Sequence, residues 1–466
     1  MMLLLDACYL ALLLILSPWL LYAALRQGKY REGYAAKLLG RVPRRDGARP
    51  AVWLHAVSVG EVNLLKTILE GLEREFPEWE YVITTTTKTG YDLARRKYAP
   101  RTVCYCPLDF SWAVRTALRR IRPELLILAE LELWPNLIRT AHRRGVRVAI
   151  VNGRLSENSY RGYRRIRPLV AGVLQRIDLL AVQNDEYAAR FRGLGARPES
   201  LHITGSLKFD GAQTDCGNPL TRKLAALASI SPEDIVFLAG STQEPEESLA
   251  LDAYRRLSAA HPRLRLILVP RHPARCDEVA QLLDRSGLPW QRRSRLDQRE
   301  MVAGARILLV DTVGELGGWW GLAQIAFVGG SMGRRGGQNM IEPAAYGAAV
   351  CFGPNTRNFR DVVALFLRSG AASVVGSGEE LAAFVQRCLI DPVWASELGG
   401  RAQQLVAEQR GATTRTVELL ATVMGGRRAC LRPDPPGGAI RRPRNCPATG
   451  VQQTLMSQLK PPAAGT

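Results

Sequence analysis

Residues 51–61 read AVWLHAVSVGE, an apolar run that ends in Ser58, Gly60 and Glu61. A short run of apolar and β-branched residues, bounded by polar ones, is typical of a buried β-strand. Ser58 and Glu61 have the S-x-x-E spacing of a capping box, which predicts that a helix begins directly after the strand. A strand that leads into a helix is the repeating unit of parallel α/β proteins. The motif therefore predicts a parallel sheet with Glu61 at one end of it.

The same pattern of short apolar runs and amphipathic stretches recurs along most of the chain. Further candidate strands in the first half lie at 81–87, 102–106, 125–130, 146–152, 179–184 and 202–205. A polar stretch interrupts the pattern at 211–219, after which apolar runs follow at 235–241, 265–271, 306–311, 325–331, 349–354 and 373–376. Right-handed crossovers place the loops after the strands on one side of each sheet. We predict an α/β fold of two Rossmann-like, doubly wound domains that face a cleft.

The N-terminal segment differs from this pattern. Residues 7–25 are almost entirely apolar and are long enough to span a bilayer. Asp6 precedes them, and many Lys and Arg residues follow directly after them. By the positive-inside tendency, the chain after the apolar segment stays in the cytoplasm. We predict a single-pass membrane anchor, with an interfacial or buried helix as the alternative.

The length of the chain also bounds its organisation. A chain of 466 residues is too long for one compact core and suits two domains of ordinary size. The C-terminal stretch is rich in Pro, Gly and Arg and lacks periodicity, as disordered segments do. The predicted segments are an anchor at 1–25, a first domain at 26–210, a linker at 211–219, a second domain at 220–425 and a basic, disordered tail at 426–466.

The charge of the chain narrows the class of partner. Its formal net charge is +20, and such an excess favours an anionic partner: nucleic acid, an acidic membrane surface or a phosphorylated substrate. No zinc finger, helix-turn-helix or aromatic stacking platform is recognisable, so we do not expect nucleic acid. The nine cysteines include no C-x-x-C pair, and no metal site is predicted.

Ionisable side chains follow several strands of the first half, at the edge where parallel sheets usually bind their ligands. The start of a helix would keep Glu61 ionised and able to accept a proton. Glu130 and Glu132 follow another strand and lie on one face if that strand continues. Lys208 follows the last strand of this half. Simple helix capping by Glu61, and solvated surface charges at the other positions, are the alternatives that need no ligand.

The second half has three candidate ligand-binding turns, each directly after a predicted strand. Arg271 and His272 stand between two prolines, and a second turn, DTVGEL, covers 311–316. The third turn, 329–343, has several glycines and two arginines between a strand and a helix, which resembles a phosphate-binding turn. Glu342 in this turn could bind the hydroxyls of a ribose. A glycine-rich surface loop without a ligand is the alternative.

Eight short motifs, in this order, resemble those of one family: the 3-deoxy-D-manno-octulosonic acid (Kdo) transferases of lipopolysaccharide assembly. The motifs are HAVSVGE (55–61), ELELWPN (130–136), NGRLS (152–156), GSLKFD (205–210), AGST (239–242), VPRHP (269–273), DTVGEL (311–316) and GGQNMIEP (336–343). The ordered set is far more specific than any single motif. The chain departs from the family pattern at Gly153, Gln243, Val313 and Gln338, where the family commonly has alanine, histidine, methionine and histidine.

The resemblance implies a GT-B fold, with the acceptor on the first domain and the donor CMP-Kdo mainly on the second. It implies an inverting glycosyltransferase that moves Kdo from CMP-Kdo to a phosphorylated lipid A precursor, lipid IVA, without a metal or another cofactor. The reaction would take place at the cytoplasmic leaflet of the cell inner membrane. The alternatives are another GT-B envelope glycosyltransferase that uses a UDP-sugar, and an inactive, membrane-tethered GT-B scaffold.

The resemblance also assigns roles to individual residues. Glu61 matches the catalytic base, and Glu130 and Lys208 match positions that stabilise the transition state. The positions that match donor-binding residues are Arg271, His272, Val313, Gly314, Glu315, Asn339, Met340, Ile341 and Glu342.

Overall fold

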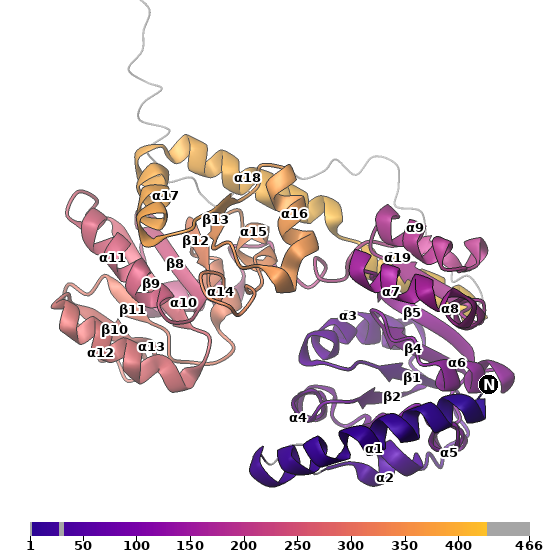
Figure 1. Ribbon diagram of the computed structural model, residues 1–466. Coiled ribbons are helices and arrows are strands. Elements are labelled where there is room, and N and C mark those ends of the chain that lie inside the picture. The colour runs from indigo at the N-terminus through magenta and orange to yellow at the C-terminus, as the bar shows by residue number, and fades with distance from the viewer. Residues whose placement is uncertain (1, 28–31, 426–466) are drawn as a thin grey trace, which may run out of the picture. The chain divides into compact units, whose positions relative to one another are not determined.

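The computed structural model describes residues 2–27 and 32–425, which form two compact units (Figure 1). Met1–Gly211 and a segment that starts at Gln409 make up the first unit, and Ala212–Glu408 make up the second. Each unit is built on one seven-stranded sheet, and all the neighbouring strands run parallel. The predicted α/β class with two parallel-sheet domains is confirmed. The tail predicted at 426–466 lies outside the described residues.

The sheet of the first unit has the strand order β3-β2-β1-β4-β5-β6-β7. Its strands are β1 (Ala51–His55), β2 (Glu80–Thr85), β3 (Thr102–Tyr105), β4 (Leu125–Ala129), β5 (Arg147–Gly153), β6 (Leu179–Val182) and β7 (Leu201–Ile203). Its helices after the N-terminal one are α2 (Tyr34–Leu39), α3 (Val59–Glu75), α4 (Lys88–Tyr98), α5 (Ser111–Ile121), α6 (Pro135–Arg143), α7 (Glu157–Arg165), α8 (Arg167–Leu174), α9 (Asp185–Gly193) and α19 (Ala412–Val423). β1 and β4 flank the topological switch point, where the strand order reverses and α/β proteins usually bind ligands.

The second unit has the order β10-β11-β9-β8-β12-β13-β14. Its strands are β8 (Ile235–Thr242), β9 (Leu264–Pro270), β10 (Trp290–Arg292), β11 (Ile307–Leu309), β12 (Ile325–Val328), β13 (Ala349–Phe352) and β14 (Ser373–Val374). Its helices are α10 (Pro219–Leu227), α11 (Glu246–Ser258), α12 (Cys276–Ser286), α13 (Arg293–Leu296), α14 (Leu316–Trp320), α15 (Ile341–Ala345), α16 (Arg360–Arg368), α17 (Gly378–Ile390) and α18 (Pro392–Gln409). The switch point of this unit lies between β8 and β12.

Each strand predicted from the sequence is present, because buried parallel strands are continuous apolar runs that a sequence displays directly. Pro135 is the first residue of α6, where its missing N–H costs no hydrogen bond. Strand β10 was not predicted, because its three residues, Trp290–Arg292, form an edge strand next to several arginines.

The last helix of the described chain returns to the first unit. Residues up to 425 were predicted to belong to the second domain, whereas α19 packs against α3, β5 and β6 of the first unit. Gly71 on α3 allows this close approach, since a Cβ there would lie 2.7 Å from a methyl group of Val417 on α19. Asp210 fixes the start of the returning segment by accepting hydrogen bonds from the backbone N–H groups of Gly411 (2.7 Å) and Thr413.

The predicted membrane anchor is wrong. The N-terminal residues do form a long helix, α1 (Met2–Gln27), with Pro18 inside it. Across residues 2–27 and 32–425, however, no helix is both long enough and apolar enough to cross a membrane. The predicted location, in the inner membrane through a single-pass anchor at 1–25, depended on this segment and is therefore also wrong.

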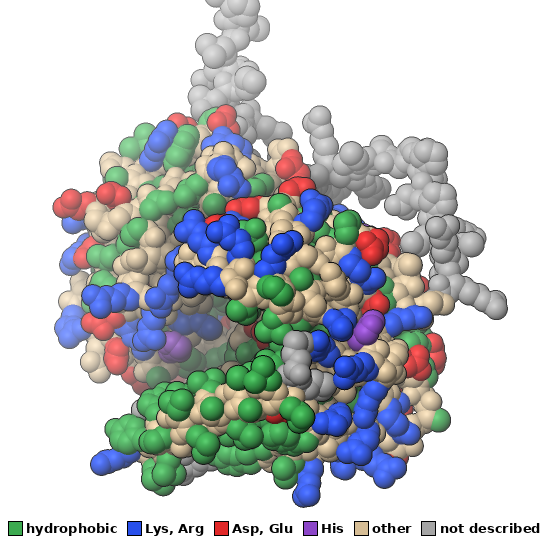
Figure 2. Space-filling model, turned by 45° about the vertical axis from the view of Figure 1, so that its right-hand side comes forward, with side chains coloured by type: hydrophobic (Ala, Val, Ile, Leu, Met, Phe, Trp, Pro, Cys, Tyr) green, Lys and Arg blue, Asp and Glu red, His purple; other side chains and the backbone are tan. Residues whose placement is uncertain are grey.

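Polar contacts dock α1 on the first unit. The buried carboxylate of Asp6 accepts hydrogen bonds from the Ser111 backbone N–H (2.8 Å) and the Asn136 side-chain amide (3.2 Å). Tyr9 donates a hydrogen bond to Asp109 (3.2 Å). Figure 2 shows apolar side chains gathered on α1, and its exposed large residues are Leu3, Leu4, Leu10, Leu12, Leu14, Ile15, Leu16, Trp19, Leu21, Tyr22 and Leu25. The apolar segment of the sequence is thus a surface helix that is tied to the protein by Asp6.

We expect the Asp210→Ala variant to lose about 1–2 kcal/mol of unfolding free energy, because two N–H groups at the start of α19 lose their acceptor. Urea denaturation would measure the change. Asp215→Ala is the control, since among the described residues the side chain of Asp215 accepts one local hydrogen bond, from the Gly217 N–H (2.8 Å), in an exposed turn. Equal destabilisation by both substitutions would contradict a specific role for Asp210.

Candidate functional site

Glu61 lies in the first turn of α3, directly after β1. Its carboxylate accepts hydrogen bonds from the Val57 backbone N–H (2.8 Å) and the Ser58 hydroxyl (2.8 Å). Burial raises the pKa of Glu61, while these two hydrogen bonds act in the opposite direction. The neighbouring charge of Glu130 also raises this pKa, and Arg154 lowers it. The carboxylate is therefore held in place and takes up a proton more readily than an ordinary glutamate.

Glu130 follows β4 on the other side of the switch point. It has a left-handed backbone conformation with φ 59°, and its N–H donates to the Val151 carbonyl (2.9 Å). A non-glycine residue in this conformation costs about 1 kcal/mol or more, and such strain is often found at functional sites. The side chain of Glu130 is 11% exposed, and its Oε2 lies 2.8 Å from Nε of Arg154. Arg154 thus compensates a largely buried charge.

Asn152 ties the loop of Lys208 to this edge of the sheet. Asn152 also has a left-handed conformation, with φ 55°, and is fully buried at the end of β5. Its Oδ1 accepts a hydrogen bond from the Leu207 backbone N–H (3.0 Å), one residue before the partly buried Lys208. Glu61, Glu130 and the loop that bears Lys208 therefore all lie at the carboxyl edge of the first sheet.

Glu132 belongs to the same cluster. It was predicted from the sequence to lie on one face with Glu130, but no role was assigned to it. Its carboxylate accepts a hydrogen bond from the Trp134 indole N–H (2.7 Å). Burial raises the pKa of Glu132 to about 7, and the nearby charges of Glu61 and Glu130 add to this effect. The E-x-E spacing of 130–132 was the available signal. In the described part of the chain, no group of three or more His, Cys, Asp or Glu residues is arranged to hold a metal ion.

In the second unit, the side chain of Glu315 is engaged within the protein. Buried Arg293 donates two hydrogen bonds to the Glu315 carboxylate, at 2.8 and 2.7 Å, and the Thr312 hydroxyl donates a third at 2.7 Å. Val313 and Gly314 are exposed beside it. This turn can therefore offer a ligand its backbone and the Val313 side chain more readily than the carboxylate of Glu315.

Asn339 and Glu342 form a second polar pair at the start of α15. The Asn339 side-chain amide donates to Glu342 Oε1 (2.9 Å), and its Oδ1 accepts from the Ile341 N–H (3.1 Å). Burial raises the pKa of Glu342, and the hydrogen bond from Asn339 lowers it. The side chains of Met340 and Ile341 are fully buried, so only their backbone could meet a ligand.

Arg271 and His272 are exposed directly after β9. The Arg271 backbone N–H donates to the Thr242 carbonyl at the end of β8 (2.9 Å), next to the switch point. The predicted donor-binding residues follow β9, β11 and β12, and they therefore lie at the carboxyl edge of the second sheet.

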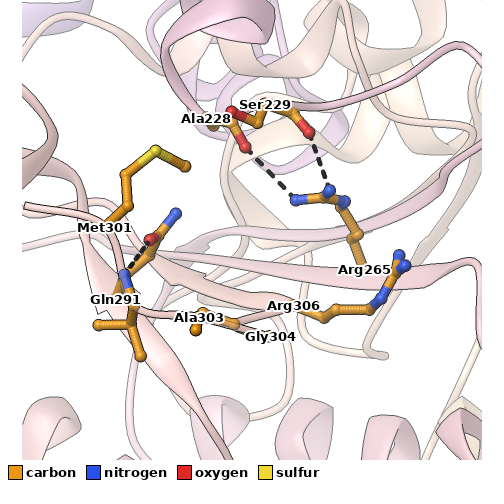
Figure 3. Close-up of a pocket in the computed structure, with 10 residues that line it drawn as sticks. Ala228, Ser229, Arg265, Gln291, Met301, Ala303, Gly304 and Arg306 are labelled. Carbon is orange, nitrogen blue, oxygen red and sulfur yellow. Dashed lines mark hydrogen bonds between the residues drawn. The ribbon is translucent and has the colours of Figure 1, made fainter. Parts of the chain in front are cut away.

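A cavity of about 420 Å³ lies at the other edge of this sheet. It is lined by Ala228, Ser229, Arg265, Gln291 and residues 301–306. Figure 3 shows the guanidinium of Arg265 pointing toward the backbone carbonyls of Ala228 and Ser229, which accept its hydrogen bonds at 3.4 and 2.8 Å. None of the predicted site residues lines this cavity, so it is separate from the candidate site.

Comparison with known proteins covers both units. Residues 31–211 match the family described as 3-deoxy-D-manno-octulosonic-acid transferase (kdotransferase). The 3-deoxy-D-manno-octulosonic acid transferase of Haemophilus influenzae is 31% identical over 420 residues, which cover 88% of this chain and 97% of that protein. The protein of the same name from Bordetella pertussis is 34% identical over 419 residues, which cover 87% of this chain and 96% of that protein.

Solved structures share the two-domain architecture. The UDP-GlcNAc 2-epimerase of Neisseria meningitidis has a TM-score of 0.54 at 12% identity and covers 80% of this chain and 100% of its own. A glycosyltransferase from Rickettsia africae has a TM-score of 0.52 at 10% identity, with 81% and 99% covered. At such low identity the likeness concerns the fold alone, which is of the GT-B type.

The raised pKa of Glu132 predicts a dependence of stability on pH. A carboxyl group whose pKa rises on folding binds its proton more tightly in the folded state, so the folded state loses stability as the pH rises from the ordinary value of 4.5 to about 7. Glu132→Gln removes this dependence. We expect calorimetry to show the wild type losing stability relative to the variant between pH 5 and pH 8. Glu124→Gln, at an exposed position, is the control and should show no such change with pH. A difference in stability between wild type and Glu132→Gln that stays constant with pH would contradict the prediction.

Proposed function

The chain belongs to the 3-deoxy-D-manno-octulosonic acid (Kdo) transferase family, and we propose that it transfers Kdo from CMP-Kdo to a phosphorylated lipid A precursor such as lipid IVA, with inversion at the anomeric carbon. The observation that carries the proposal is the position of Glu61. Its carboxylate stands at the carboxyl end of the central strand β1, fixed by two hydrogen bonds and partly open to solvent. An acceptor hydroxyl would need a base in such a place.

In the proposed reaction, Glu61 accepts the proton of an acceptor hydroxyl while the oxygen attacks the anomeric carbon of Kdo. The new C–O bond forms as the bond from the anomeric carbon to the CMP phosphate breaks, and CMP leaves with the bonding electrons. The raised pKa of Glu61 supports this role, because a base with a pKa nearer to neutral pH takes a proton more effectively.

The transition state of this displacement has oxocarbenium character, with positive charge on the sugar ring and negative charge on the leaving phosphate. In the proposal, the carboxylate of Glu130 stabilises the positive charge, and Lys208 offsets the negative charge of the Kdo carboxylate or of the phosphate. The hydrogen bond from Leu207 to Asn152 supports this role, because it fixes the loop of Lys208 near Glu130. A phosphate monoester is a stable anion, so its departure does not require a metal.

The donor nucleotide is assigned to the second unit. We propose that Arg271 and His272 bind the phosphate, and that the backbone of residues 313–315 and 339–341 contacts the cytidine. Glu342 would accept hydrogen bonds from the ribose hydroxyls, with Asn339 holding its carboxylate in place (2.9 Å). This use of backbone groups fits the burial of Met340 and Ile341.

Removal of the proposed base tests the mechanism. Glu61→Gln should lower the rate of Kdo incorporation into the lipid A precursor by about 10²–10⁴-fold, because the amide cannot accept a proton. Binding of CMP to the purified variant should stay at the wild-type affinity. Glu124→Gln, at the opposite edge of the same sheet, is the control and should keep full activity. Transfer by the Glu61 variant at the wild-type rate would refute the role of Glu61.

The identity of the nucleotide separates Kdo transfer from transfer of a UDP-linked sugar. A ligand that binds only the folded state raises the unfolding temperature. We expect CMP to raise the unfolding temperature of the purified protein, whereas UDP at the same concentration leaves it almost unchanged. Stabilisation by UDP and not by CMP would favour a different glycosyltransferase activity. Mass spectrometry of the lipid product would then identify the sugar that is transferred.

A further inference from the structure

Glu246 lies at the switch point of the second unit, between the ends of β8 and β12. It begins α11 and is 1% exposed. Its carboxylate accepts four backbone hydrogen bonds: from Gln243 (2.8 Å), Gly330 (2.6 Å), Ser331 (2.8 Å) and Met332 (2.9 Å). Three of these donors belong to the glycine-rich turn that follows β12. The buried carboxylate is thus fully enclosed by N–H groups.

Such an arrangement of N–H groups is one that α/β proteins commonly use for a ligand phosphate. At a switch point, consecutive backbone N–H groups of a glycine-rich turn form a concave nest for an anion. Here a carboxylate of the protein itself occupies that nest. The fit is close, because a Cβ at Gly329 would lie 2.7 Å from an oxygen of Glu246. The expectation that this turn binds phosphate is therefore corrected for its first part, 329–332.

The rest of the turn is fixed from this anchored part. The Gly337 N–H donates to the Gly330 carbonyl (2.7 Å), and the Asn358 side-chain amide donates to the Arg335 carbonyl (2.9 Å). Beyond them the chain leads into the residues that match the donor motif. Within the described residues, the backbone N–H groups of Gln338, Asn339 and Met340 have no intramolecular acceptor. In the described turn, the N–H groups of 333–336 also have no intramolecular acceptor, but those of 338–340 lie in the stretch that matches the donor motif.

We propose that Glu246 is a positioning residue: its carboxylate takes the place of a bound phosphate, holds the turn in shape without a ligand, and leaves the backbone of 338–340 to receive the donor nucleotide. The part of this proposal that concerns the nucleotide rests on the proposed function. The part that concerns the turn does not, since it depends only on the hydrogen bonds of Glu246.

Two measurements on the purified full-length protein test the proposal. Hydrogen–deuterium exchange mass spectrometry measures how fast the backbone amides of residues 329–342 exchange. Isothermal titration calorimetry gives the Kd for CMP. In Glu246→Ala, which empties the nest, amide exchange in 329–342 should become at least about tenfold faster, and the Kd for CMP should rise by at least about tenfold. Formate, a small carboxylate that fits the emptied nest, should restore both values in the variant and leave the wild type unchanged.

Asp234→Asn is the matched control. Asp234 is also buried, at 6% exposure. At the opposite edge of the same sheet it forms an ion pair with Arg265 (2.7 Å) and accepts a hydrogen bond from Arg306 (2.8 Å). This variant should lower the unfolding temperature and leave both the exchange of 329–342 and the Kd for CMP unchanged. A general loss of stability would therefore not be mistaken for a loss of positioning.

The outcomes are distinguishable. Wild-type exchange and a wild-type Kd in folded Glu246→Ala would overturn the proposal, as would a defect that formate does not correct. If Glu246→Ala fails to fold, Glu246→Asp is the second variant. It keeps the charge, but its side chain is one methylene group shorter, so the carboxylate lies farther from the N–H groups. It should show the same changes in weaker form. Unchanged exchange in Glu246→Asp would then overturn the proposal. Failure of the wild type to bind CMP would refute the proposed donor. The amide exchange of 329–342 would still test whether Glu246 holds the turn in shape.

Discussion

A carboxylate that is removed from water must be met by N–H donors or by a cation, and both units place such a group where the strand order reverses. In the first unit, Glu61 receives two hydrogen bonds and stays partly exposed, while Glu130 is paired with Arg154. In the second unit, Glu246 receives four hydrogen bonds and is buried. The number of donors differs between the two carboxylates. Glu61 has two donors and stays partly exposed, whereas Glu246 has four and is buried as part of the framework.

The fold was largely predictable because its signals are local. Apolar runs marked the buried strands, and the S-x-x-E spacing marked the start of α3 and with it the place of Glu61. The short edge strand Trp290–Arg292 carries almost no apolar signal, and it was missed. The roles assigned to Glu61, Glu130 and Lys208 remain proposals, although the fold brings their segments to one edge of the first sheet.

What could not be predicted depends on contacts between distant parts of the chain. The loop donors to Glu246 lie more than eighty residues after it, and no spacing in the sequence announces that pairing. The raised pKa of Glu132 comes from burial and from the charge of Glu61, which follows a strand much earlier in the chain. The apolar N-terminal run suggested a membrane span, but Asp6, seen in the sequence as a flanking charge, is buried against α5 and α6.

The return of α19 to the first unit has a consequence for the order of folding during synthesis. Helix α19 completes the surface formed by α3, β5 and β6, yet the ribosome makes it only after residues 212–408 of the second unit. The described part of the second unit, Ala212–Glu408, is continuous in sequence and can fold as soon as it emerges, whereas the first unit must wait with part of its core uncovered. The domain made first is therefore the one finished last, and a chaperone that shields apolar surface would act on it for longest.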